Sequence, residues 1–301
     1  MTDNNNDHKC APNKIYSEGS CFNKQSLKLI IKSYDKIYNT QYYINNQSKS
    51  KKELVKLLKT LMKKKCNDQM CWIRDVNLDM ANSDENSTID DIKNYTFLPE
   101  GPKEKYGWLS NFDISNVIKQ YVKLHEDFMF LGAVPSDFEE VIKLFRELDF
   151  EELEKNGKYR FGLVMNLDPS NRPGIHWVGL YFNLKTNEIY YFDSVGEKPI
   201  ESFKKFITRI TKYLYKKNFN KTLPDNFAKT ELDKYVKQIY DKFQIYYNTN
   251  QHQKKDSECG VYATHFIIEM MNNKKFDDVM NNIIDDKTMN EYRKKIFINA
   301  K

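Results

Sequence analysis

Apolar residues recur at helical spacing in the first third of the chain. One stripe runs from residue 27 to 38 and a second from 54 to 62, with apolar side chains three or four positions apart. Their members are Leu27, Ile30, Ile31, Tyr34, Tyr38, Leu54, Leu57, Leu58, Leu61 and Met62. Residues 77–102 are polar and acidic and end in Pro-Glu-Gly-Pro, which is typical of a linker. The pattern predicts a helical N-terminal arm with an acidic linker over residues 1–100 and a core domain over 101–301.

In the core domain the pattern changes from helical to strand-like. Stripes at 114–124 and 138–145 predict two amphipathic helices, the second with a capping box that begins at Ser136 and Asp137. Short aromatic and β-branched segments predict strands, and they lie at 159–167, 175–182, 188–193 and 243–248. An amphipathic stripe at 203–214 predicts a helix before the last strand, and the all-apolar segment 261–271 predicts a buried one. This order of elements indicates an α+β domain rather than repeating βαβ units.

Charge and hydropathy narrow the function classes. The 48 basic residues nearly match the 42 acidic ones, and the lysine runs are short, so a solvated surface explains them. A weak contact with nucleic acid is the alternative interpretation of these lysines. No apolar run approaches membrane-spanning length, and the first 25 residues lack an apolar stretch, so we expect neither membrane insertion nor a signal peptide.

The cysteines suggest neither a disulfide framework nor a metal site. Their number, five, is odd, and no Cys/His cluster has the spacing of zinc ligands, so we expect no metal and no cofactor. Cys66 and Cys71 could pair or bind metal, but we interpret them as lone core thiols. A free thiolate survives in a reducing compartment, where we therefore expect the protein.

Three residues on different predicted elements have side chains suited to covalent catalysis. His176 lies on an apolar strand, where a structural core histidine is the alternative. Asp193 closes the next strand, where it could instead cap a turn, and a hairpin through 183–187 would bring it close to His176. Cys259 lies where a polar loop meets the buried helix. The free N–H groups of a helix N-terminus favour a thiolate there, although a buried structural thiol is the alternative.

Together these residues predict a catalytic triad. A cysteine nucleophile needs a base within hydrogen-bond reach, and the base needs an acceptor on its other nitrogen. We assign Cys259 as the nucleophile, His176 as the base and Asp193 as the residue that orients the base. Gln253, six residues before Cys259, could stabilise an oxyanion together with the Cys259 backbone N–H.

The spacing of these residues resembles a known signature. His176-Trp177, then Asp193, then Gln253 before Cys259-Gly260 resembles the Ulp1/adenovirus-protease-like superfamily of cysteine proteases. Within it, the chain is similar to the polyprotein-processing proteases of African swine fever virus and other large DNA viruses, over roughly residues 70 to 300. Three further segments carry this likeness: Pro99-Glu100-Gly101-Pro102, Leu109-Ser110-Asn111-Phe112-Asp113-Ile114 and Glu258-Cys259-Gly260.

The resemblance implies a fold and a site. It implies a central mixed sheet with a buried helix that begins at the nucleophile, and a substrate channel lined by Trp177 and a second aromatic residue. It also implies the roles already assigned to His176, Asp193, Gln253 and Cys259. One position departs from the swine fever enzyme, because Asp193 is the aspartate typical of the SUMO proteases in a place where that enzyme has asparagine.

The expected function is that of a viral cysteine endopeptidase that cleaves structural polyproteins after Gly-Gly. Its partner would be a protein substrate, either a viral polyprotein or a SUMO-like modifier precursor, and its location the host cytoplasm (the viral factory) and the virion. Deconjugation of SUMO or ubiquitin-like modifiers is the closest alternative, because it would use the same residues. An acetyltransferase on the same fold and an inactive scaffold are the others. The arm over residues 1–100 either stabilises the core or docks a large substrate.

Overall fold

The chain divides into two compact units, residues 1–100 and residues 101–301. The structure is a computed structural model that describes residues 18–66, 69–78, 88–89, 92, 98–222, 243–298 and 300. Five acidic residues of the predicted linker lie outside the described residues; they are Asp79, Asp84, Glu85, Asp90 and Asp91.

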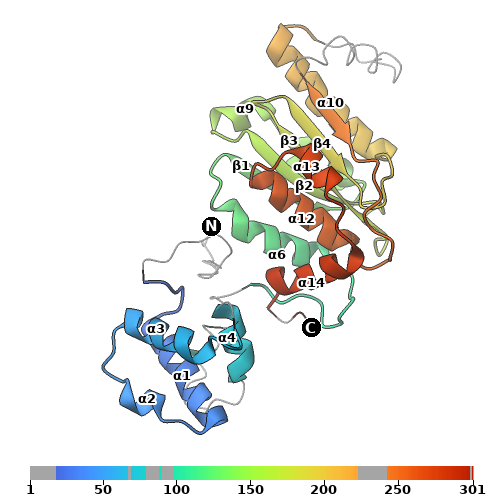
Figure 1. Cartoon of the computed structure of the whole chain (residues 1–301). Helices are drawn as coiled ribbons and strands as arrows, with labels where there is room; N and C mark the ends of the chain where they lie inside the picture. The colour runs from blue at the N-terminus through green and yellow to red at the C-terminus, as the bar shows by residue number, and fades with distance from the viewer. Residues whose placement is uncertain are drawn as a thin grey trace. The chain divides into compact units, whose positions relative to one another are not determined.

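The N-terminal unit is helical, as expected (Figure 1). Its α1 begins after Asn23, whose side chain accepts the N–H of Ser26 at 2.8 Å. Its α3 begins with a capping box between Ser50 and Glu53. The two predicted apolar stripes lie on these two helices and contribute their buried side chains. The helices are α1 (Lys24–Tyr38), α2 (Tyr42–Asn45), α3 (Lys51–Met62) and α4 (Gln69–Val76).

Cys66 and Cys71 form a disulfide bond in this unit, so the prediction of lone core thiols was wrong. The connection from α3 to α4 turns back and brings their Cα atoms to 5.3 Å, a separation that a disulfide spans. Cys21 is also disulfide-bonded, and Cys259 is the free cysteine among the described residues. The argument for a reducing compartment therefore no longer holds for this unit, because it rested on unpaired thiols.

A five-stranded mixed sheet forms the centre of residues 101–301 (Figure 1). The outer pairs, β1 with β2 and β4 with β5, are parallel, whereas the two inner pairs are antiparallel. The four predicted strands are confirmed, and β1 is an additional one. In spatial order the strands are β1 (Phe128–Val134), β2 (Arg160–Asn166), β3 (Trp177–Asn183), β4 (Glu188–Phe192) and β5 (Gln244–Tyr247).

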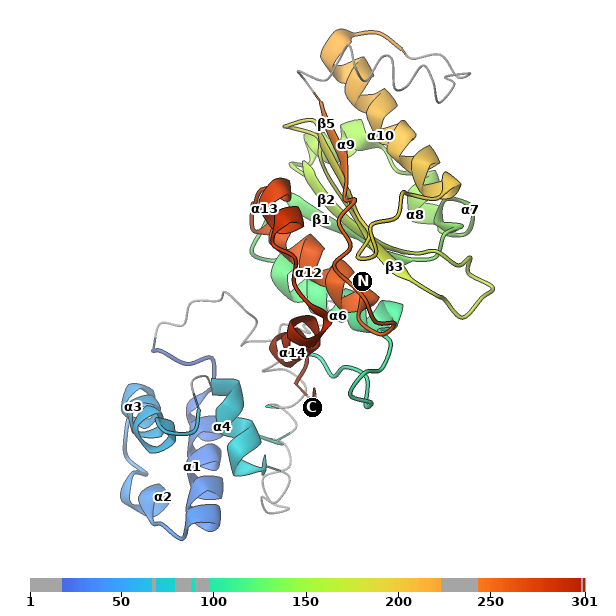
Figure 2. The ribbon, with the colours of Figure 1, turned by 45° about the vertical axis from the view of Figure 1, so that its right-hand side comes forward.

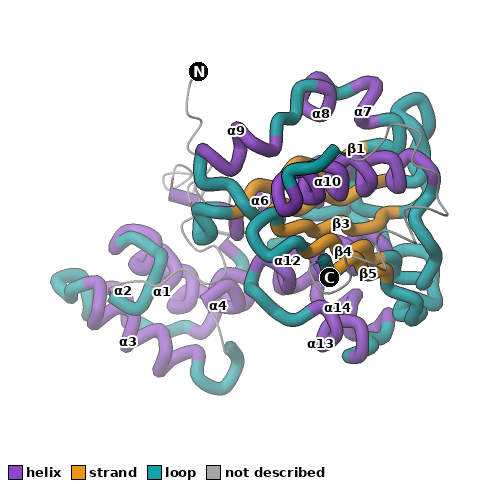
Figure 3. The backbone as a smooth tube through the Cα atoms, turned by 90° about the horizontal axis from the view of Figure 1, so that it is seen from above, coloured by secondary structure: helices purple, strands orange, loops and turns teal. Residues whose placement is uncertain are grey.

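Helices cover both faces of this sheet (Figures 2 and 3). Alternation along β4 shows the division, because Tyr190 and Phe192 pack toward α12 while Ile189 and Tyr191 pack toward α10. One face carries α6 (Asn111–Val122), α12 (Cys259–Met271), α13 (Phe276–Asn281) and α14 (Asp286–Ile296). The other carries α7 (Phe138–Val141), α8 (Lys143–Arg146), α9 (Phe150–Lys155) and α10 (Glu201–Phe219). No helix in the described part of the chain is long and apolar enough to cross a membrane.

The predicted helix at 138–145 is broken into α7 and α8. Ile142 between them is extended, with φ −107° and ψ 115°. The expected capping box is absent, because the Asp137 side chain accepts hydrogen bonds from the N–H and Oγ of Ser170 instead of capping α7. Tertiary contact with the β2–β3 connection has therefore replaced the local cap.

A methyl group at Gly179 is expected to disturb the packing of β3 on α12. A Cβ there would lie 2.6 Å from Cδ1 of Phe266, closer than two carbon atoms can pack. Gly179→Ala should lower the free energy of unfolding, measured in urea, by about 1–3 kcal/mol. Phe266→Leu opens space, so it should reduce the cost of the alanine in a double-mutant cycle. Additive costs would show that the clash is not the cause.

Candidate active site

Cys259 is the first residue of α12 and is almost completely buried. The first N–H groups of a helix lack intrahelical partners and lie at its positive end, so they favour negative charge on the sulfur. The next residue must be small. A Cβ on Gly260 would lie 3.0 Å from Cβ of Leu109 and 3.2 Å from Cδ1 of Trp177. The helix therefore starts in close contact with both of these residues.

The β3–β4 hairpin brings His176 and Asp193 together. His176 directly precedes β3 and Asp193 directly follows β4, and the antiparallel register pairs Gly179 with Phe192. The two side chains therefore meet at the same end of the hairpin. Nε2 of His176 lies 2.7 Å from Oδ1 of Asp193.

Asp193 is held from several sides. Its side chain is buried, and Oδ1 also accepts the N–H of Val195 at 2.9 Å. Its backbone carbonyl accepts Nδ2 of the buried Asn248 at 2.8 Å. The carboxylate is therefore fixed, and it fixes the imidazole of His176 through Nε2, which leaves Nδ1 for the thiol.

The electrostatics of His176 favour an imidazolium. Burial alone lowers its pKa, but hydrogen bonds with Asp193 and Cys259 outweigh burial and raise the pKa of His176 to about 9. The ring is therefore protonated at neutral pH. A thiolate beside an imidazolium is the arrangement that an activated cysteine nucleophile requires.

Gln253 lies in the loop that precedes the nucleophile. Its Oε1 accepts the Ser194 hydroxyl at 2.6 Å, and its Nε2 donates to the carbonyl of Lys255. The side-chain amide has two N–H groups, and only one of them donates a hydrogen bond to another described residue. Gln253 is not among the residues that line the cavity at Cys259, and its role as an oxyanion donor stays a prediction.

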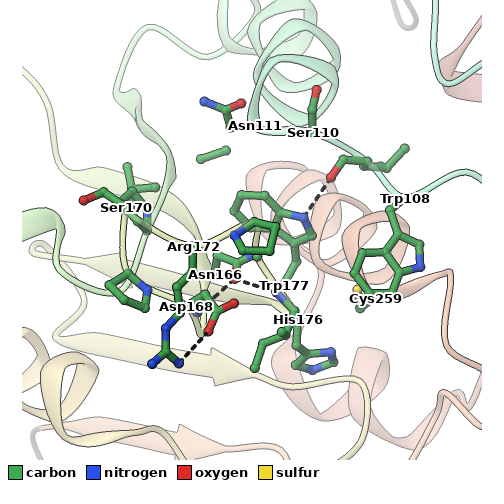
Figure 4. Close-up of a pocket in the computed structure, with 18 residues that line it drawn as sticks. Trp108, Ser110, Asn111, Asn166, Asp168, Ser170, Arg172, His176, Trp177 and Cys259 are labelled. Atoms are coloured by element: carbon green, nitrogen blue, oxygen red, sulfur yellow. Dashed lines mark hydrogen bonds and ion pairs between the residues drawn. The ribbon is translucent and has the colours of Figure 1, made fainter.

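A cavity of about 510 Å³ opens at Cys259 (Figure 4). Leu109, His176 and Trp177 line it beside the thiol. At its other end it is lined by residues 133–135, at the end of β1, and by several residues of the segment 166–175 that joins β2 to β3. Among the described residues, no group of three His, Cys, Asp or Glu side chains could hold a metal ion.

Trp108 is a cleft residue that the sequence analysis did not assign. Its side chain is 56% exposed and lines the same cavity as Trp177. Nε1 of Trp177 donates to the carbonyl of Leu109 at 2.9 Å, which ties β3 to the loop that carries Trp108. Trp108 is therefore a candidate for the second aromatic residue expected beside Trp177. The two residues lie far apart in the chain, so the sequence did not indicate that they meet.

A buried arginine connects two loops that lead to the cleft residues Trp108 and Cys259. Arg293 on α14 donates to the carbonyls of Gly107 at 2.8 Å and Ser257 at 2.9 Å. It therefore joins the loop before Trp108 to the loop before Cys259. Sequence reasoning missed it because it lies far from every catalytic segment in the chain.

Residues 163–301 match the family model described as the Ulp1 protease family, C-terminal catalytic domain. This region is a Ulp1-family catalytic domain. It contains all the residues that we assigned to catalysis. Trp108 and the other cavity-lining residues at 109–111 and 133–135 precede it. Assignment to the superfamily is confirmed, and the protein is a cysteine protease.

Two relatives that are similar along most of the chain are viral proteins. A protein of Acanthamoeba polyphaga mimivirus named as a thiol protease is 28% identical over 306 residues, which cover 96% of this chain and 93% of the relative. A cysteine protease of African swine fever virus is 23% identical over 277 residues, with 85% and 93% covered. The crystal structure of the swine fever protease shares the fold, with a TM-score of 0.57 at 22% identity over 82% of this chain and 90% of that one.

The raised pKa of His176 predicts the pH dependence of catalysis. The ring is protonated below about pH 9 and loses its proton as the pH rises through that value, so kcat/KM should fall with a basic midpoint near 9. Asp193→Asn removes the charge that holds the proton and should move this midpoint to lower pH. Peptide cleavage across the pH range measures it. An unmoved midpoint in a folded Asp193→Asn variant would contradict the role of Asp193.

Proposed function

We propose that this protease is an endopeptidase that cleaves viral structural polyproteins after Gly-Gly. The observation that carries the proposal is the meeting of Cys259, His176 and Asp193 at the end of a cleft flanked by Trp108 and Trp177. The cleft opens at the Cys259 thiol, and the three side chains supply a nucleophile, an acid–base group and the carboxylate that orients it.

The geometry supports a two-step acyl transfer. The Cys259 sulfur attacks the scissile carbonyl carbon, and the oxyanion that forms accepts the backbone N–H of Cys259 and the side chain of Gln253. The His176 imidazolium then gives its proton to the leaving amine as the C–N bond breaks. Neutral His176 next takes a proton from water, whose oxygen attacks the thioester and releases the acid. Asp193 orients the ring and stabilises its charge throughout.

The cleft walls favour substrate residues without side chains. The Trp177 ring is fixed by its hydrogen bond to the Leu109 carbonyl and by contact with Gly260. Trp108 lines the same cavity. A channel between two indole rings passes a Gly-Gly backbone, whereas a Cβ meets one of the rings. Exclusion of this kind selects against other sequences rather than for tighter binding.

Removal of a SUMO-like modifier is the second candidate. Relatives in several isolates of African swine fever virus are named SUMO-1 cysteine proteases, and that reaction would use the same triad. Similarity along 96% of the chain to the mimivirus protein favours the processing role, because it includes the helical N-terminal unit. We propose that this unit, residues 1–100, docks the large substrate or stabilises the core, and that the enzyme acts in the host cytoplasm and the virion.

The substrate class is tested by offering both kinds of precursor. A capsid polyprotein that contains Gly-Gly sites and a SUMO precursor are incubated with the enzyme, and the new N-termini are sequenced. Processing of the polyprotein is expected, together with its loss in Cys259→Ala. Cys66→Ser with Cys71→Ser is the control and should keep peptide cleavage. Cleavage by Cys259→Ala, or processing of the SUMO precursor alone, would contradict the proposal.

The channel itself is tested with a peptide whose Gly-Gly is changed to Ala-Gly or Gly-Ala. Each change should lower kcat/KM more than about tenfold, because the added methyl clashes with an indole ring. Trp108→Ala should recover part of the turnover of the alanine peptides. Equal turnover of all three peptides by the unmodified enzyme would exclude a narrow channel.

A further inference from the structure

A nearly buried carboxylate without a hydrogen bond lies in the cleft. Asp168 follows β2, and its side chain is 8% exposed. Among the described residues no donor hydrogen-bonds to this carboxylate, and the nearest cation, Nη1 of Arg172, is 3.8 Å away. Buried carboxylates are normally paired or hydrogen-bonded. The carboxylate of Asp168 therefore has one long ion pair, with the exposed Arg172, and accepts no hydrogen bond from the described residues.

The carboxylate faces the cavity. Asp168 lines it, and neither of its oxygens is among the fully enclosed polar atoms that lack a partner. Figure 4 shows Asp168 and Arg172 at one side of the cleft and Cys259 at the other. Asp168 is also the one carboxylate among the described residues that line this cavity.

The backbone holds Asp168 rigidly. Its N–H donates to Oδ1 of Asn166 at 2.9 Å, and its carbonyl accepts the N–H of Ser136 at 2.9 Å. The same Asn166 oxygen accepts the N–H of Ile175 at 3.1 Å, which closes the β2–β3 connection. A carboxylate held in this way loses little conformational freedom when a ligand binds.

We propose that Asp168 forms a subsite for a basic side chain, lysine or arginine, of the substrate beyond the Gly-Gly channel. This inference rests on the proposed endopeptidase function. The incoming cation replaces Arg172, whose side chain is 68% exposed and can turn into solvent. A fixed carboxylate that is mostly out of water interacts more strongly with a cation than a mobile, exposed guanidinium does with an anion. The site therefore selects a basic rather than an acidic side chain.

A positional peptide series tests this subsite. Gly-Gly is kept, and lysine, glutamine or glutamate is placed in turn at each neighbouring position. At one position, lysine should raise kcat/KM about tenfold over glutamine, the size of a charge-assisted hydrogen bond. Asp168→Asn keeps the shape and should remove this preference while the glutamine peptide is still cleaved. Arg172→Met removes the internal competitor and should strengthen it.

Asp137→Asn is the matched control. It removes one negative charge from a neighbouring loop, but Asp137 bonds to Ser170 and does not line the cavity. It should leave the lysine preference unchanged. An equal loss in this control would show a general charge effect and overturn the subsite.

Other results are equally decisive. Lack of a lysine preference at every position, or its survival in Asp168→Asn, would overturn the inference. A glutamate preference lost in Arg172→Met would assign the site to acidic side chains and also overturn it. If no Gly-Gly peptide of any sequence were cleaved, the proposed function itself would fail, and the subsite with it.

Discussion

The buried hydrogen bond between His176 and Asp193 is the interaction on which the site depends. It links the two ends of one hairpin, fixes the imidazole and keeps the ring protonated although burial opposes the charge. Because Asp193 is buried and held by the N–H of Val195, the hydrogen bond sets the orientation of the ring. The register of β3 and β4 therefore sets the geometry of the base, and α12 has only to bring Cys259 to the remaining ring nitrogen.

Close packing sets the position of the nucleophile and of the cleft wall together. Trp177 touches Gly260 and bonds to Leu109, so the residue after the base also locates the helix that carries the thiol. Arg293 connects the loop before Trp108 to the loop before Cys259 by hydrogen bonds to the carbonyls of Gly107 and Ser257. Cys259 and the cleft residue Trp177 therefore share packing contacts, and residues far apart in the chain meet there.

The sequence was sufficient to find residues that break a local pattern. His176, Asp193 and Cys259 each interrupt an apolar element at its end, and this made them visible. Strand β1 was missed because its burial repeats every third residue and a register shift near Gly132 removes the alternation of a strand. Trp108, Asp168 and the Cys66–Cys71 bond depend on contacts between elements, about which local periodicity carries no information. The meeting of His176, Asp193 and Cys259 was inferred from a resemblance and from chemistry rather than from periodicity, and the place of Gln253 beside them stays a prediction.

The central claim is that a buried imidazolium is held between a carboxylate and a thiol. Nuclear magnetic resonance of ¹⁵N-labelled histidine measures it directly, with His176→Gln used to assign the signal. We predict that His176 is doubly protonated at neutral pH and titrates near pH 9, and that Cys259→Ala moves its titration to lower pH. A His176 ring that is neutral at pH 7, or one whose titration ignores both Cys259 and Asp193, would contradict the account.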